Sequence, residues 1–202
     1  RAQINHCLSE TPSVTCVDEN GVEIQDWDVT EVVDMSKLLR AAKDFNQNIT
    51  SWTVDGVTSM NSMFYGASSF NQDISNWDVG AVTDMGSMFK DASAFNGFIK
   101  EWSVGSLVHT EYMFYGAKAF NCDIGDWNVS SITSIRAMFK NAYAFNQDIS
   151  RWDVTQVTDT TECFENARAF AQYFCWPVPS IASPLSSVKA GPVHSIYVDG
   201  SC

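Results

Sequence analysis

The sequence lacks the features by which membrane-spanning and nucleic-acid-binding proteins are recognised. No stretch approaches the roughly 20 consecutive apolar residues that a membrane-spanning helix needs. Basic residues are scarce, with 12 Lys and Arg against 24 Asp and Glu and a formal net charge of -12. No run of Lys or Arg offers the basic patch that phosphate backbones and anionic lipid surfaces attract. We therefore expect no membrane span and no nucleic-acid partner.

Motifs for metal binding and catalysis are also missing. The three histidines (His6, His109 and His194) are scattered, and no two cysteines have the CxxC spacing typical of a zinc site. No motif of known catalytic mechanics appears. The acidic residues at outward positions are interpreted as a solvated face rather than as catalytic carboxylate pairs. We expect a protein that is not an enzyme and has no cofactor.

Six cysteines are present, an even number that favours disulfides and therefore an oxidising compartment. Cys7 is expected to pair with Cys16 across a short N-terminal loop, and the other four to supply two further bridges. Cys163 occupies a column otherwise held by methionine, so a buried, inert thiol is the alternative there. The disulfide candidates are Cys7, Cys16, Cys122, Cys163, Cys175 and Cys202.

Two glycosylation sequons agree with export from the cell. They are Asn48-Ile49-Thr50 and Asn128-Val129-Ser130, so Asn48 and Asn128 are the candidate acceptors of covalent glycans. Together with the cysteines, they predict a secreted protein, extracellular or displayed at the cell surface.

What the sequence has in abundance is repetition with a period of 25 residues. Columns of Val, Ile, Ala and Phe repeat with this same spacing, which indicates an array of stacked units. The clearest column is tryptophan, interpreted as core: Trp27, Trp52, Trp77, Trp102, Trp127 and Trp152.

Each unit is expected to contain one strand and one short helix. Residues 74–82 carry Ile, Trp, Val and Val at the spacing of a leucine-rich-repeat strand, with Trp77 pointing inward. Residues 85–92 carry Met, Met, Phe and Ala at i, i+3, i+4 and i+7, one apolar face of a helix. The predicted fold is an α/β repeat solenoid, a leucine-rich-repeat-like stack of six 25-residue strand-plus-short-helix coils with one parallel sheet.

Two polar columns are interpreted as structural. Asp73, Asp123 and Asp148 share a turn column; Phe98 interrupts it, so turn capping is favoured over a calcium site. An asparagine column is expected to form a buried ladder whose amides bond turn backbones of neighbouring coils. Its members are Asn46, Asn71, Asn96, Asn121 and Asn146.

These columns resemble the BspA-like surface-protein repeats, relatives of the leucine-rich repeats. The resemblance is carried by residues 63–85, MFYGASSFNQDISNWDVGAVTDM, and extends over about residues 22–176. It implies a solenoid displayed outside the cell in adhesion or surface-coat roles. It implies no single ligand, because members share a scaffold and not a site.

Three segments are expected: an N-terminal cap over 1–21, the repeat solenoid over 22–176, and a proline-rich tail or cap over 177–202. The tail motivates the first functional hypothesis, an extracellular structural protein that assembles with copies of itself, end to end, into a fibril or coat. The alternative is an adhesin-type module that binds a protein or glycan through the concave strand face.

Overall fold

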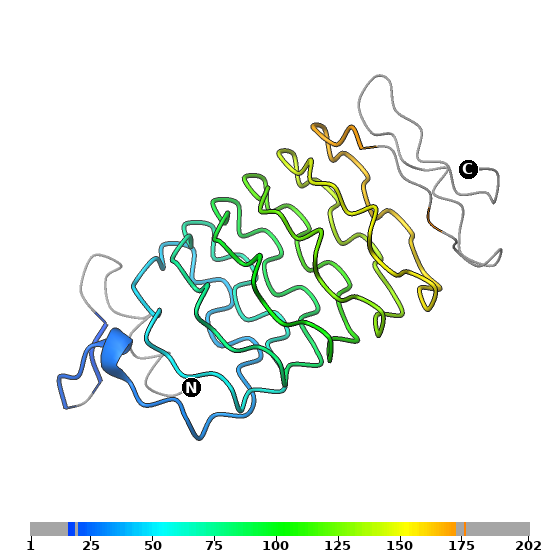
Figure 1. Cartoon of the computed structure of the whole chain (residues 1–202). Helices are drawn as coiled ribbons and strands as arrows, with labels where there is room; N and C mark the ends of the chain where they lie inside the picture. The colour runs from blue at the N-terminus through cyan, green and yellow to red at the C-terminus, as the bar shows by residue number, and fades with distance from the viewer. Residues whose placement is uncertain (1–15, 19, 173–175, 177–202) are drawn as a thin grey trace.

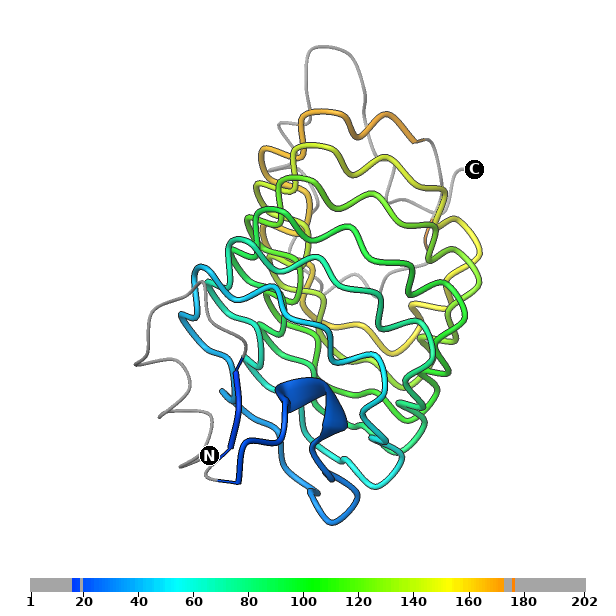
Figure 2. The same ribbon diagram turned by 90° about the vertical axis from the view of Figure 1, so that its left-hand side faces the viewer.

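The structure is a computed structural model that describes residues 16–18, 20–172 and 176. The chain winds into successive coils that lie side by side and follow one another in sequence order (Figure 1). Parallel bridges join residues 25 positions apart, beginning with Asp34 to Ser59 and ending with Ser134 to Asp159. Viewed after a quarter turn, the coils lie one behind another as similar loops (Figure 2).

Regular elements are few in the described part of the chain. One 3-10 helix, η1 (Ile24–Asp26), precedes the first full coil, and an antiparallel bridge joins Val17 to Glu23 beside it. The remaining described residues are turns, extended backbone and isolated bridges. The coil geometry therefore comes from turns and from hydrogen bonds between coils.

Residues 84–92 show how neighbouring coils are joined. The N–H groups of Met85, Ser87, Phe89 and Asp91 donate to carbonyls of the following coil at 2.7–2.9 Å. The intervening N–H groups of residues 88, 90 and 92 donate within the coil, to the carbonyl three residues earlier. Ser87 and Asp91 both have φ of 57°, in the left-handed region that few non-glycine residues adopt.

The helix expected over 85–92 is therefore not what the structure has. An α-helix bonds its N–H groups within one segment, whereas here alternate N–H groups point to the next coil. The positive φ values also interrupt any helical run. The strand expected over 74–82 differs as well: two turns divide it, closed by the N–H groups of Trp77 and Val82. The parallel bridges fall at Asp84 and its equivalents, one residue per coil.

Each coil has two parts, a turn side and a Trp side. The turn side comprises 34–45, 59–70, 84–95, 109–120, 134–145 and 159–170. The Trp side comprises 21–33, 46–58, 71–83, 96–108, 121–133 and 146–158.

The core lies between these two parts and is built of stacked rings. Phe89 and Phe95 have ring centroids 3.8 Å apart within one coil, and Phe89 lies 5.7 Å from Phe114 of the next. Both phenylalanine columns are buried throughout the middle coils. Such contacts give each coil an apolar interface with its two neighbours, as expected of repeat proteins.

The tryptophans add a hydrogen bond to this core. The indole N–H of Trp77 donates to the Ile49 carbonyl of the preceding coil at 3.3 Å, and Trp102 donates to Ile74 at 3.1 Å. Trp27 begins the column, is only partly buried, and bonds the Val22 carbonyl locally. A buried carbonyl needs a partner, which explains why this column holds Trp rather than a leucine.

Candidate functional site

The turn side gathers the tyrosines and most of the cations. Of the ten Lys and Arg residues between 20 and 172, eight belong to the turn side, as do all four tyrosines in that range. Eight acidic residues balance those cations. The Trp side carries twelve acidic and two basic residues. Basic residues and tyrosines are thus concentrated on the turn side, and net negative charge is concentrated on the Trp side.

Lys90 lies among three tyrosine rings. Its Nζ is 5.3 Å from the ring centroid of Tyr65, 4.9 Å from Tyr112 and 4.7 Å from Tyr115. Tyr65 belongs to the preceding coil and the other two belong to the following coil. All three distances are within the range of about 6 Å over which a ring face attracts a cation.

Two arginines extend this group along the stack. The Arg40 guanidinium lies 4.9 Å from the Tyr65 ring centroid, and Arg136 Nε donates to the Tyr112 hydroxyl at 3.0 Å. We call the resulting row the cation–tyrosine strip. It consists of Arg40, Tyr65, Lys90, Tyr112, Tyr115 and Arg136.

The backbone holds this strip in register. Gly66 N–H donates to the Lys90 carbonyl and Asp91 N–H donates to the Tyr115 carbonyl, both at 2.7 Å. Tyr112 has φ of 61°, which is unusual for a bulky residue. The equivalent residues of neighbouring coils have the same conformation, so the fold imposes it. Burial raises the pKa of Asp91, while Lys90 and Lys118 act in the opposite direction.

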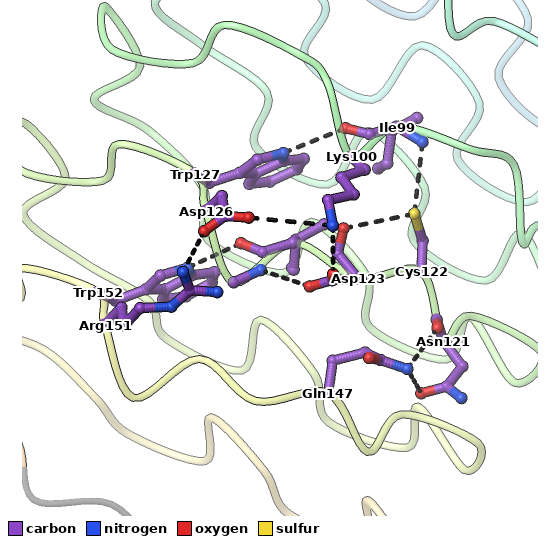
Figure 3. A network of polar contacts seen from close by, with 12 residues as sticks. Ile99, Lys100, Asn121, Cys122, Asp123, Asp126, Trp127, Gln147, Arg151 and Trp152 are labelled. Carbon is purple, nitrogen blue, oxygen red and sulfur yellow. Dashed lines mark hydrogen bonds and ion pairs between the residues drawn. The ribbon is translucent and has the colours of Figure 1, made fainter.

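The Trp side carries a different polar network, shown in Figure 3. Lys100 Nζ bonds Asp123 at 2.8 Å and lies 3.9 Å from Asp126, and Arg151 pairs with Asp126 at 2.6 Å. The bond from Lys100 holds the pKa of Asp123 below its usual range. These two cations are the only basic residues of the Trp side, and each pairs with acidic side chains of an adjacent coil.

The aspartates of the turn column cap the backbone of their own coils. Asp73 accepts from Ser75 N–H at 2.9 Å and Asp123 from Gly125 N–H at 3.1 Å. Backbone hydrogen bonding lowers the pKa of Asp73. Among residues 16–18, 20–172 and 176, no three His, Cys, Asp or Glu side chains are grouped closely enough to hold a metal ion.

The asparagine column makes its ladder at the surface, which corrects the expected burial. Asn71 N–H donates to Asn46 Oδ1 at 2.9 Å, and the column ends where Ala171 N–H donates to Asn146 Oδ1 at 2.8 Å. Asn46, Asn71 and Asn96 are exposed, whereas Asn121 and Asn146 are half-buried. Each side-chain oxygen accepts the backbone N–H at the equivalent position of the next coil, as Asn96 Oδ1 does from Asn121 at 2.8 Å.

The sequon asparagines Asn48 and Asn128 are both exposed on the Trp side. Asn48 Oδ1 accepts from Thr50 N–H at 2.9 Å, and Asn128 Oδ1 accepts from the Ser130 hydroxyl at 2.8 Å. Their glycosylation stays a prediction.

The cysteines divide into bridged and free. Cys16 is disulfide-bonded to a partner outside the described residues, while Cys122 and Cys163 are free thiols. The expectation that these two supply disulfides is therefore wrong, and the buried-thiol alternative holds for Cys163. Both lie within the stack, Cys163 fully buried and Cys122 half-buried against the Ile99 N–H. Cys7, Cys175 and Cys202 lie outside the described residues.

Alkylation without reductant tests this assignment. Burial raises the pKa of both thiols, and the thiolate is the reactive form. We expect slow labelling of native Cys122 and labelling of Cys163 only in denaturant, measured by peptide mass spectrometry. Labelling of either residue that requires prior reduction would contradict the free thiols.

In the part of the chain that the structure describes, no helix is long and apolar enough to cross a bilayer. The N-terminal and C-terminal segments expected as caps, 1–21 and 177–202, lie largely outside the described residues.

Comparison with known proteins places the chain in one family. No curated protein and no solved structure matches the chain. One family does match, in two overlapping segments, residues 11–121 and 98–183. Because these segments span most of its length, the chain belongs to the family described as Mycoplasma protein of unknown function, DUF285.

Proposed function

We propose that the chain is a non-catalytic repeat protein of the cell exterior, in an adhesin-type role, that binds a partner through its turn side. The observation that carries this proposal is the cation–tyrosine strip. Protein-binding hot spots are enriched in Tyr, Trp and Arg, and the described tyrosines lie on the turn side alone. The finer classification as a BspA-like, leucine-rich-repeat-type solenoid belongs to this same proposal.

The proposed surface differs from the one expected from the sequence. The concave face was expected on the Trp side, whose outward positions include Asp78, Ser103 and Asp153, all exposed. Its tryptophans point inward, and its charge is strongly acidic. Small and acidic residues of this kind offer few anchors for a partner, so the turn side is favoured.

Self-assembly, the first hypothesis from the sequence, stays a prediction. It depends on residues 177–202, which lie outside the described residues. The acidic Trp side also disfavours contacts between two Trp sides, since like charges repel.

Matched variants test the proposed binding side. The turn-side variant carries Tyr65→Ala, Tyr115→Ala and Arg136→Ala. The Trp-side control carries Thr53→Ala, Ser103→Ala and Gln156→Ala, and these three control positions are exposed. The probes are phosphatidylcholine vesicles, phosphatidylglycerol vesicles, heparin and mucin.

We expect the native chain and the control to bind at least one probe equally, and the turn-side variant to bind it at least about tenfold more weakly, as loss of hot-spot residues would produce. Retention is measured by sedimentation or surface plasmon resonance. The proposal is wrong if the native chain retains no probe or if the turn-side variant retains every probe as the native chain does.

A further inference from the structure

Lys90 and the three tyrosines around it are the part of the cation–tyrosine strip with the best-defined geometry. Tyr65, Tyr112 and Tyr115 approach one ammonium group from two coils, at 4.7–5.3 Å from their centroids. The rings of Tyr112 and Tyr115 are tilted by 53° to one another, with centroids 6.1 Å apart. Rings inclined in this way enclose a cation rather than stack on each other.

This enclosure is built before any ligand arrives. Arg136 fixes the Tyr112 hydroxyl, and Arg40 lies against Tyr65 from the coil on the side away from Lys90. The backbone carbonyls of Lys90 and Tyr115 each accept an N–H group of the preceding coil. Rings held by neighbouring groups lose little conformational entropy when they bind.

Lys90 fits this enclosure imperfectly. A lysine ammonium carries three N–H donors, whereas ring faces attract charge but are poor acceptors. Within the described ranges, Lys90 forms no ion pair, unlike Lys100 and Lys140. Its side chain is only half-buried and ends a flexible four-carbon stem. It can therefore leave the rings without breaking a salt bridge.

We propose that Tyr65, Tyr112 and Tyr115 form a cage for a quaternary ammonium group, and that Lys90 occupies this cage until such a ligand displaces it. A trimethylammonium group keeps its positive charge, has no N–H donors to satisfy, and places methyl groups against ring faces, the chemistry for which aromatic cages are suited. The adjacent Asp91 interacts electrostatically with Lys90 and would do so with any cation in its place. This inference rests on the proposed turn-side function and names its ligand class.

The test titrates choline and tetramethylammonium into the full chain and follows the ligand methyl resonances by NMR. Lys90→Ala empties the cage and is expected to bind about tenfold more tightly than the native chain, because the internal competitor is gone. Tyr112→Ala in the Lys90→Ala background is expected to weaken binding about three- to tenfold, and Tyr112→Phe to retain it, since the ring face remains. Lys43→Ala, an exposed cation outside the strip, is the matched control.

Vesicles distinguish the source of the group. Binding of Lys90→Ala to phosphatidylcholine but not to phosphatidylglycerol assigns a lipid headgroup, and binding of free choline alone assigns a soluble ligand; either supports the cage. The cage is overturned if Lys90→Ala binds choline no better than the native chain, or if removal of Tyr112 leaves binding unchanged. Retention of mucin or heparin by the turn side, without choline binding, would leave the proposed function standing and reject only the cage. Melting temperatures of all variants establish that they are folded.

Discussion

Replacing Trp77 by alanine is expected to lower the free energy of unfolding by about 3–5 kcal/mol, the range for truncating a large buried aromatic side chain. Trp77 is 3 % exposed and packs its ring 6.4 Å from Trp52 and 6.3 Å from Phe64. The substitution would leave a cavity between two coils and remove the donor to the Ile49 carbonyl. Urea denaturation followed by circular dichroism measures the change.

Two further variants separate the contribution of the indole hydrogen bond from that of ring burial. Trp77→Phe keeps most of the apolar contact but leaves the Ile49 carbonyl without its indole partner, at an expected cost of about 1–3 kcal/mol. Trp27→Ala tests the same column where the ring is only half-buried. We expect it to cost about 1–2 kcal/mol, because this ring buries less apolar area in the folded protein. A loss below about 1 kcal/mol for Trp77→Ala, well under the range for a buried ring, would show that this ring contributes no core packing.

The inward positions of each coil could be predicted from the sequence because burial repeats with the period of the chain itself. Ile74, Trp77, Val79 and Val82 are all buried. Their spacing is visible in one unit and reinforced by the same residue types 25 positions away. A column of large apolar residues has no stable alternative to the interior.

The backbone conformation could not be predicted in the same way. Met85, Met88, Phe89 and Ala92 are spaced as on one face of a helix, yet a series of turns also brings them to one side. The helix and the series of turns differ in where alternate backbone N–H groups donate, and in this protein they donate to carbonyls of the next coil. A signal was present in the column of Asp91, whose equivalents include Gly66, Gly116 and Asn141. Gly, Asn and Asp tolerate positive φ better than other residues.

The cation–tyrosine strip could be predicted from the sequence only in part. Tyr65, Lys90 and Tyr115 occupy one column of the repeat in three successive coils. The alternation of Tyr, Lys and Tyr at 25-residue spacing is visible in the sequence. Tyr112 lies three residues before Tyr115, and its contact with Lys90 of the preceding coil depends on the turn conformation of the backbone, which residue spacing alone does not reveal.

The sharpest test of the turn architecture is at Ser87, because glycine there has opposite effects in the two backbones. With φ of 57°, Ser87→Gly relieves backbone strain and is expected to raise the free energy of unfolding by up to about 1 kcal/mol. In an α-helix, the same change would lower it by a similar amount. The free energy of unfolding of Ser87→Gly is measured beside that of Ser87→Ala, which should gain nothing in a turn and should stabilise a helix.

Proline at the same position should be far more damaging. Proline fixes φ near −65° and has no N–H, whereas Ser87 N–H donates to the Glu111 carbonyl at 2.8 Å. We expect Ser87→Pro to cost more than about 3 kcal/mol and to broaden the unfolding transition, since coils on either side communicate only through this coil. If Ser87→Gly destabilised the protein and Ser87→Ala stabilised it, residues 85–92 would be helical. That result would contradict the backbone hydrogen bonds between this coil and the next.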